Sequence, residues 1–363
     1  MVKITKIKLH SLLDFIQSEQ YLSFTDKPIS LIRAKSYVEN PNANKEDVVL
    51  YMAFFNKQLV GYRTILSDVF YSKNSKQKFG WLSGNWVHPK HRRKNISTIL
   101  LNEVLKDWNK QLMYSNYAEA SKAVYDKINL FAELTNLNGV RYYRRWSLAD
   151  LLPPKNRFFK YLKPLLSLTD WIFNLKFKPN YTQLIHQNNI QIIKHWDKEI
   201  QLFLSPFKKV ELFKRNIETY QWIKNNPWIK TEEETKQESK KYYFSSYAKI
   251  FKSDFYVIKN STNKIIAVLN ISIKNKQLKI PYFYSLEEGV SLSKDFIVTL
   301  CSKYGINYVT IYDEMLNKIF IKEAFIKKKP FSQKYFITKD IAKNYPDLNT
   351  FSIQTGDGDS VFT

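Results

Sequence analysis

The spacing of hydrophobic and polar residues divides the first 150 residues of the chain into alternating strands and helices. Residues 2–7 alternate with a period of two, as a half-buried strand does, and residues 48–67 have a hairpin pattern around three polar residues. The full prediction is a strand at 2–7, helices at 11–20 and 29–37, hairpin strands at 48–55 and 59–67, a loop at 72–78, a strand at 79–87, a helix at 96–108, a strand at 111–117, a helix at 119–128 and a strand at 140–148.

Two consecutive prolines, Pro153 and Pro154, mark a predicted domain boundary because they favour extended backbone. Residues 158–178 are basic and amphipathic. We expect an interdomain helix with solvated lysines there, with a helix on a membrane surface as the alternative. The predicted domains are therefore a first domain at residues 1–150, a basic amphipathic linker at 151–180 and a second domain at 181–363.

The second half repeats the order of elements seen in the first. Its hydrophobic pattern predicts a helix at 208–225, a charged loop or solvated helix at 232–241, strands at 255–259, 264–273 and 276–283, a helix at 291–304 and a strand at 308–312. Hairpin, helix and strand follow one another in both halves. This repetition indicates a duplicated fold with weak sequence similarity.

Chain length and net charge limit the number of domains and the kinds of partner that the sequence fits. With 363 residues the chain is long enough for two domains, and a hydrophobic content of 44% allows each a core. The net charge of +24 is spread over both halves, since residues 1–150 contain 23 Lys and Arg against 13 Asp and Glu. A charge without a block or tail favours a lysine-rich surface over nucleic-acid binding, so we expect no nucleic-acid partner.

Cysteine usage and the hydrophobic pattern predict a cytoplasmic protein. Cys301 is the single cysteine of the sequence and cannot form an intrachain disulfide, which fits a reducing compartment. Residues 1–10 do not have the apolar run of a secretory signal, and no stretch reaches the ~18 uninterrupted apolar residues that cross a bilayer. We therefore expect no transmembrane segment.

A basic turn between a predicted strand and a predicted helix carries the strongest chemical signal. It reads Trp-Val-His-Pro-Lys-His-Arg-Arg-Lys-Asn-Ile-Ser-Thr from Trp86 to Thr98. The first amides of a helix lack carbonyl partners and the helix dipole adds positive charge there, which Arg92, Arg93 and Lys94 reinforce. A diphosphate group would bind at such a point.

This segment resembles the acetyl-CoA-binding motif of GNAT-type N-acetyltransferases, approximately Val-x-Pro-x-x-Arg-x-x-Gly-x-Gly/Ala. Val87, Pro89 and Arg92 match the motif. Asn95 replaces the first glycine, which is tolerable because Asn adopts left-handed backbone conformations readily, and Ser97 replaces the second small residue. The residues that the resemblance implies for cofactor binding are Trp86, Val87, Arg92, Arg93, Lys94, Asn95, Ile96, Ser97 and Thr98.

The resemblance also implies a fold and a co-substrate. The fold would be α/β (α+β), of the acyl-CoA N-acyltransferase type, with a mixed, mostly antiparallel central sheet flanked by helices. The co-substrate would be acetyl-CoA, and no metal is expected. Because the helix predicted at 291–304 lacks a preceding Arg-rich loop, the second domain would be a degenerate GNAT-like copy that shapes the acceptor site or adds binding surface.

A second segment, residues 124–130, resembles the GNAT sequence Leu-Tyr-Glu-Lys-Leu-Gly-Phe. In that family the tyrosine often lies near the sulfur of coenzyme A and protonates the departing thiolate. The resemblance therefore makes Tyr125 the catalytic candidate. A phenol with a pKa of about 10 keeps its proton until a thiolate leaves. A tyrosine packed on a helix is the alternative interpretation.

The strand at 79–87 would, by the same resemblance, separate from its neighbour and offer backbone groups to the pantetheine arm. Alternation places Trp81, Ser83 and Asn85 on one face of this strand. No carboxylate occurs within it, so the general base stays unassigned. Ser83 and Asn85 are the candidates for orienting the acceptor or a water molecule.

Other groupings of reactive residues give weaker signals. His88 and His91 have no Cys or acid pair nearby to complete a metal site. Residues 356–359 resemble part of a calcium loop but lack its closing glutamate, so we interpret them as a polar turn. Cys301 lies on an apolar helix face, and no Gly-x-Ser-x-Gly nucleophile motif is present.

The sequence thus predicts an N-acetyltransferase that moves an acetyl group from acetyl-CoA to the amine, or a hydroxyl, of a small molecule or peptide. Direct transfer is expected because binding both reactants side by side supplies most of the rate enhancement. Two alternatives stay open. One is a transferase that uses an aminoacyl-tRNA held by the basic surface, and the other is a catalytically silent module that binds coenzyme A.

Overall fold

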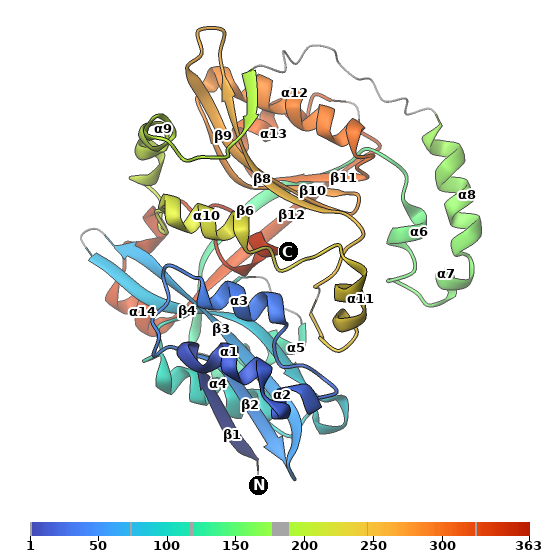
Figure 1. The fold of residues 1–363 in the computed structure, drawn as a ribbon. Helices are drawn as coiled ribbons and strands as arrows, with labels where there is room; N and C mark the ends of the chain where they lie inside the picture. The colour runs from blue at the N-terminus through green and yellow to red at the C-terminus, as the bar shows by residue number, and fades with distance from the viewer. Residues whose placement is uncertain (1, 73–74, 116–118, 176–188, 245, 324) are drawn as a thin grey trace. The chain divides into compact units, whose positions relative to one another are not determined.

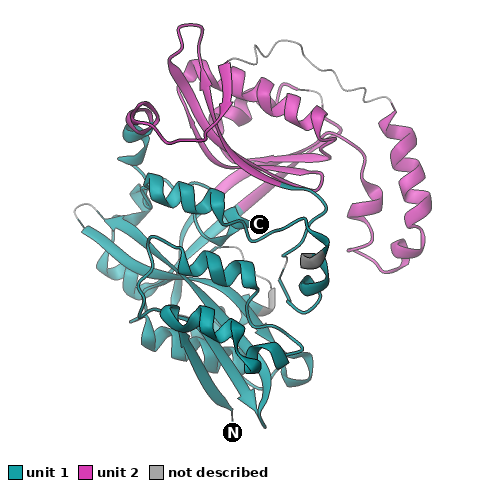
Figure 2. Ribbon diagram, in the orientation of Figure 1, with its two compact units in different colours: residues 1–136, 204–251, 333–363 teal, residues 137–203, 252–332 magenta. Residues whose placement is uncertain are grey.

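The computed structural model describes residues 2–72, 75–115, 119–175, 189–244, 246–323 and 325–363. Its contacts divide the chain into two compact units, each assembled from separate stretches (Figure 2). Unit 1 comprises Met1–Asn136, Leu204–Phe251 and Gln333–Thr363, and unit 2 comprises Leu137–Phe203 and Lys252–Ser332. The contiguous domains 1–150 and 181–363, with the linker 151–180, rest on the proline break and the repeated order of predicted elements, and they stay a prediction.

Unit 1 contains a sheet with the strand order β1-β2-β3-β4-β5-β12. Its strands are β1 (Lys3–Lys8), β2 (Val48–Phe55), β3 (Gln58–Ser72), β4 (Ser75–Val87), β5 (Leu112–Ser115) and the second half of β12 (Lys327–Thr338). Neighbouring strands run antiparallel except β4 and β5, which are parallel. The long β2–β3–β4 meander follows from runs of alternating and fully buried apolar residues.

Helices cover both faces of this sheet (Figure 1). On one face lie α4 (Ile96–Asp107) and α5 (Glu119–Ile128), and on the other α1 (Leu12–Gln17), α3 (Leu31–Val38) and α10 (Ile217–Asn225). The unit also contains α2 (Glu19–Ser23), α11 (Glu233–Ser239) and α14 (Lys339–Asn344). Beneath α4 the core includes Tyr51, Val60, Ile65, Leu100, Leu101, Val104 and Leu112. Burial of this apolar face, spaced by three and four residues, holds α4 on the sheet.

The strands of unit 2 are also mostly antiparallel and follow the order β6-β11-β10-β9-β8-β7. The strands are β6 (Phe131–Tyr143, which begins in unit 1), β7 (Ile190–Ile192), β8 (Phe251–Lys259), β9 (Ile265–Lys274), β10 (Gln277–Ser285) and β11 (Tyr308–Ile311). The helices are α6 (Leu148–Leu151), α7 (Phe158–Tyr161), α8 (Lys163–Asn174), α12 (Glu287–Lys303) and α13 (Glu314–Phe320), and α9 (Lys198–Lys208) contains residues of both units. The predicted fold class is confirmed.

The two units repeat one order of elements. In unit 1, β3 and β4 are antiparallel and are followed by α4 and by β5, which pairs in parallel with β4. In unit 2, β9 and β10 are followed by α12 and by β11, which pairs in parallel with β10. The first turn of α12 contains Glu287 and Glu288, whereas Arg92 and Arg93 precede α4. The repeat supports the prediction of a duplicated fold whose second copy lacks the basic turn.

Two predicted strand boundaries are wrong. Residues 75–78, predicted as a loop, belong to β4 because the β3–β4 ladder extends to the pair Ser72 and Ser75. The strand predicted at 140–148 begins much earlier, as β6. Leu148 instead begins α6, where its amide donates a 2.8 Å hydrogen bond to Asp170.

The helix predicted at 208–225 is also wrong, because it is interrupted between α9 and α10. Leu212 donates a backbone hydrogen bond of 2.9 Å to Ser352 in the C-terminal segment. α10 then begins after Asn216, whose side chain caps it by accepting from the amide of Thr219 at 2.9 Å. β12 and α13 had no counterpart in the prediction. Residues 116–117 of a predicted strand and 176–188 of the linker and second domain lie outside the described residues.

Candidate active site

Unit 1 contains a pocket of ≈ 880 Å³ beside the starts of α4 and α5. Its walls are the second half of β4, the basic turn, the first turn of α4, the end of β5 and α5. The lining residues are Leu82, Ser83, Asn85, Trp86, Val87, His91, Arg92, Arg93, Asn95, Ile96, Ser97, Thr98, Tyr114, Ser121, Ala123, Val124, Tyr125, Lys127, Tyr243 and Phe244. The pocket therefore brings together every predicted site residue except Lys94.

β4 separates from β5 along this pocket. The two strands pair at Gly80 with Leu112 and at Trp81 with Met113, and β4 continues to Val87 with no further β5 pairing among the described residues. Such an opening leaves backbone groups of β4 available to a ligand. It agrees with the separation of strands that the GNAT resemblance implies.

A β-bulge at Ser83 changes which side chains of β4 face the pocket. The β3–β4 register skips Ser83, which makes it the extra residue of the bulge. Ser83 and Asn85 line the pocket, but the prediction that Trp81 shares their face is wrong. Trp81 is buried, and its indole nitrogen donates a 2.8 Å hydrogen bond to Asp68. Regular alternation failed here because the bulge shifts it by one residue.

The basic turn has the backbone that a ligand-binding loop before a helix requires. Pro89–His91 forms a 3-10 turn, and α4 begins at Ile96 as predicted. Arg93 and Asn95 have positive φ angles of 62° and 59°. The prediction that Asn95 adopts the left-handed conformation is confirmed. The side chain of Asn95 makes no cap hydrogen bond, and Ile96, Ser97 and Thr98 of the first turn of α4 line the pocket.

The pocket wall is positively charged at this turn. The exposed Arg92 and Arg93 line it together with His91, and its described lining side chains include no Asp or Glu. Desolvation, followed by the charges of Lys94 and His88, lowers the pKa of His91. Lys94 is exposed and lies outside the lining residues. The described residues contain no group of three or more side chains that could hold a metal ion.

Tyr125 lies in an aromatic stack on the α5 side of the pocket. Its ring centroid is 4.3 Å from that of Tyr114, which in turn lies 4.7 Å from that of Phe336. Arg63 on β3 is 1% exposed, and its Nη1 donates a 3.1 Å hydrogen bond to the phenolic oxygen of Tyr125. Nη2 of Arg63 donates to Oγ of Ser97 at 3.4 Å. One buried guanidinium thus connects the predicted catalytic hydroxyl with the start of α4.

Two further polar pairs lie along β4. Nδ2 of Asn85 donates to Oγ of Ser97 at 3.0 Å. Ser83 donates a 2.7 Å hydrogen bond to Oδ2 of Asp359 and accepts one from Nη1 of the buried Arg33 at 3.5 Å. A carboxylate therefore lies one hydrogen bond behind a hydroxyl that lines the pocket.

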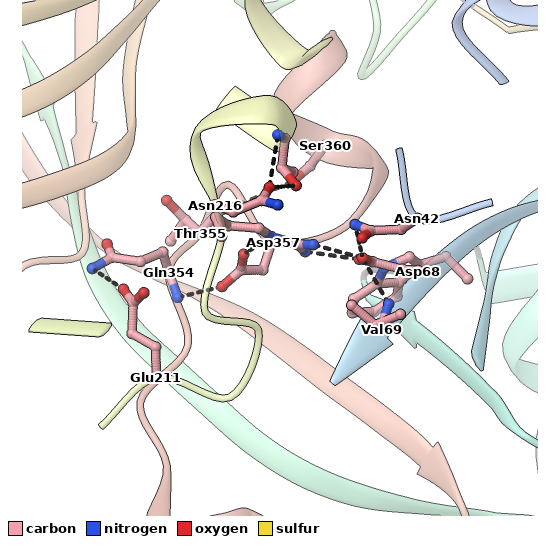
Figure 3. Close-up of polar contacts among 12 residues, drawn as sticks. Asn42, Asp68, Val69, Glu211, Asn216, Gln354, Thr355, Asp357 and Ser360 are labelled. Carbon is pink, nitrogen blue, oxygen red and sulfur yellow. Dashed lines mark hydrogen bonds and ion pairs between the residues drawn. The ribbon is translucent and has the colours of Figure 1, made fainter. Parts of the chain in front are cut away.

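A buried ion-pair cluster holds the C-terminal segment that carries Asp359 (Figure 3). Nη1 and Nη2 of Arg215 donate to the two carboxylate oxygens of Asp68 on β3 at 2.6 and 2.8 Å, and Nε of Arg215 donates to Asp357 at 2.9 Å. All three side chains are buried. Burial raises the pKa of Asp357, opposed by the charge of Arg215. Gly358, with φ of 103°, then turns the chain from Asp357 to Asp359.

Sequence reasoning missed several residues of this site, among them Arg63, Asp359, Tyr243 and Phe244. Arg63 is the one charged residue in an apolar predicted strand, which is a usable signal because a buried charge is costly unless it has a role. Asp359 was grouped with the polar turn at 356–359, and nothing local indicates its partner 276 residues away. Tyr243 and Phe244 follow a charged segment and gave no signal.

The family of the N-terminal part follows from its sequence. Residues 9–145 match the model of the Acetyltransferase (GNAT) family. This part of the chain, which contains the open strand, the basic turn, α4 and Tyr125, therefore belongs to the GNAT family of acyltransferases. A comparison with curated proteins found no matching sequence.

Solved structures are similar to the chain over most of its length. N-myristoyltransferase of Saccharomyces cerevisiae with bound myristoyl-CoA has 10% sequence identity and a TM-score of 0.53, over 93% of this chain and 79% of that chain. A structure of the same enzyme with myristoyl-CoA and inhibitors has 10% identity and a TM-score of 0.51, over 93% and 80%. A GCN5-related N-acetyltransferase from Anabaena variabilis has 11% identity and a TM-score of 0.48, over 93% and 72%. At these identities the similarity to N-myristoyltransferase shows the fold.

Proposed function

We propose that the protein transfers an acetyl group from acetyl-CoA directly to an amine, with hydroxyl groups as a second class of acceptor. One observation carries the proposal: a single pocket joins the basic turn, the first turn of α4, the open half of β4 and the hydroxyl of Tyr125. This combination offers a binding point for a diphosphate and a proton donor within the same pocket.

The donor would lie along the open strand. Its diphosphate would accept hydrogen bonds from the first amides of α4. Arg92 and Arg93, which line the pocket, would pair with its negative charge. The pantetheine arm would then follow the backbone of β4 toward Tyr125. Tyr114 and Tyr125, whose stacked rings line the pocket there, would leave room for a short acyl group.

The transfer step needs one group to accept a proton and one to donate. The acceptor nitrogen attacks the thioester carbonyl carbon, the carbon–sulfur bond breaks, and the leaving thiolate takes the proton of Tyr125. The nitrogen loses its own proton to the hydroxyl of Ser83, which passes a proton to Asp359 through their 2.7 Å hydrogen bond. This pair supplies the carboxylate that β4 itself lacks.

A thermal titration tests the donor. Acetyl-CoA at a hundredfold excess over its dissociation constant should stabilise the folded protein by about 2.7 kcal/mol and raise its melting temperature by several degrees. The Arg92→Ala, Arg93→Ala double variant should show a much smaller shift. Lys106→Ala removes an exposed charge from the far end of α4 and should behave as wild type. An unchanged melting temperature of wild type at millimolar acetyl-CoA contradicts the proposal.

Release of free thiol then tests the acceptor. We expect turnover of acetyl-CoA with at least one member of a panel of amino acids, polyamines, amino sugars and short peptides. Stabilisation by coenzyme A without turnover on the panel would favour the silent binding module. If acetyl-CoA neither raised the melting temperature nor released thiol, and the protein bound tRNA in a salt-sensitive way, the aminoacyl-tRNA transferase would be favoured.

A further inference from the structure

Two consecutive helices of unit 2 expose an apolar stripe. Along α7 and α8 the apolar side chains recur every three or four residues, so they lie on one face of the helical segment. Each is at least half exposed: Tyr161 84%, Leu165 59%, Leu168 52%, Ile172 50% and Leu175 56%. Trp171 and Phe158, both 61% exposed, lie beside the stripe. Large apolar residues gathered in this way on a surface mark an interaction site.

The opposite face of α8 fixes the direction of this stripe. Asp170 is buried, and its carboxylate accepts hydrogen bonds from the amides of Leu148 and Ala149 at 2.8 and 2.9 Å. Asn174 exchanges two hydrogen bonds with the backbone of Trp146, at 2.9 and 2.8 Å. α8 therefore lies alongside α6 (Figure 1) with its polar anchors inward, and the apolar stripe faces away from them.

The exposed charges of the same segment are all positive. Lys155, Arg157, Lys160 and Lys163 are exposed at the start of the segment. Between residues 155 and 175 the one acidic residue is Asp170, which is buried in the contact with α6. A second copy of this chain would bring the same basic groups to the contact, so the charge favours an anionic surface over self-association.

We propose that α7 and α8 bind the headgroup region of an anionic membrane, with the apolar stripe inserted and the basic side chains on lipid phosphates. An aromatic and aliphatic stripe next to lysines is the composition of helices that lie in the plane of a bilayer surface. α8 has 12 residues and a length of about 18 Å, too short to cross a bilayer. None of the described helices is long and apolar enough to span a membrane.

Flotation of the full chain with vesicles tests the proposal. We expect binding to vesicles of phosphatidylcholine mixed with phosphatidylglycerol, and little binding to phosphatidylcholine alone. The Leu168→Ser, Ile172→Ser double variant should lose binding. The matched control Leu202→Ser, Ile321→Ser changes two equally exposed apolar residues elsewhere in unit 2 and should bind as wild type. All four positions are exposed, so these variants should keep the wild-type melting temperature.

The charge contribution is tested separately. Lys160→Gln, Lys163→Gln should weaken binding to the anionic vesicles by about 25-fold, since each basic residue near such a surface contributes about a fivefold factor. Lys318→Gln, Lys322→Gln, which removes two exposed charges outside this segment, should leave it unchanged. Equal binding by the stripe variant and its control would overturn the proposal. So would an absence of vesicle binding combined with a dimer in solution that the stripe variant abolishes.

Discussion

Arg63 donates a 3.1 Å hydrogen bond to the phenolic oxygen of Tyr125 from beneath the pocket wall. Because that oxygen accepts from Arg63, the phenolic proton stays free to go to a different partner. Arg63 forms no ion pair with any described carboxylate, and its remaining hydrogen bond goes to Ser97. The guanidinium therefore orients Tyr125 and, in the proposed reaction, places positive charge beside the departing thiolate.

Replacing Tyr125 tests its role as proton donor. Tyr125→Phe should lower kcat by at least about a hundredfold, the range expected for loss of a positioned general acid. The KM for acetyl-CoA should stay nearly constant because the ring and its stacking on Tyr114 remain. Initial rates of thiol release measure both constants. Tyr243→Phe, at another tyrosine that lines the pocket, is the matched control; equal rates for the two variants would remove the catalytic role.

The pair Ser83 and Asp359 predicts a loss of activity from one substitution. Asp359→Asn keeps the size of the side chain but removes the proton acceptor behind Ser83, so kcat, measured from initial rates of thiol release, should fall about a hundredfold. Binding of acetyl-CoA should not change. Asp340→Asn, at a partly exposed aspartate of the same unit, is the control. Equal kcat values for Asp359→Asn and Asp340→Asn would contradict the assignment.

Asn95 predicts opposite effects of two small substitutions. At φ of 59°, Asn95→Ala should destabilise the protein by about 1 kcal/mol, because alanine adopts this conformation at a cost, whereas Asn95→Gly should be neutral or stabilising. Urea unfolding measures the difference. Asn102→Ala, within α4, should not be destabilising, since alanine favours helix. A glycine variant less stable than the alanine variant would show that backbone strain does not govern this position.

The sequence predicted the features that depend on local order. The β2–β3 hairpin, α4 and the left-handed Asn95 all follow from spacing or residue type within a few positions. The basic turn was recognisable for the same reason. The bulge at Ser83 was not predicted because one extra residue in a strand does not change the local composition.

The structural features that the sequence could not predict depend on contacts between distant residues. Asp359 meets Ser83 across 276 positions, and Arg215 meets Asp68 across 147. The prediction of one helix at 208–225 was wrong for a related reason, since pairing with Ser352 interrupts it. Hydrophobic spacing reports which face of an element is buried, and it does not report which distant segment covers that face.

Cys301 predicts a pH dependence of stability. Burial raises the pKa of its thiol to about 12, so the folded protein keeps the proton where the unfolded chain, with a cysteine pKa of about 8.5, loses it. Between these values the native state binds more protons, and stability falls as pH rises. Relative to Cys301→Ala, wild type should lose about 1.4 kcal/mol per pH unit above pH ~9. Urea unfolding at several pH values measures this; parallel curves for the two proteins would refute it.

The cluster of Arg215, Asp68 and Asp357 predicts a large loss of stability from one substitution. Arg215→Met leaves two buried carboxylates without their common partner, so the free energy of unfolding should fall by about 3–5 kcal/mol. Glu133→Gln, which breaks the exposed pair with Lys334, should cost less than about 1 kcal/mol. Urea unfolding at neutral pH compares the two variants.

Acid should partly rescue the Arg215→Met variant. Without the guanidinium, burial would raise the pKa of Asp357 further, so the folded variant binds protons more readily than the unfolded chain. Its stability should therefore rise, relative to wild type, as pH falls from 7 toward the carboxyl range.

The same variant should also lose transfer activity, because Asp357 no longer holds the segment that places Asp359 behind Ser83. Full activity in a destabilised Arg215→Met protein would show that the ion-pair cluster is not needed to position Asp359 for proton transfer.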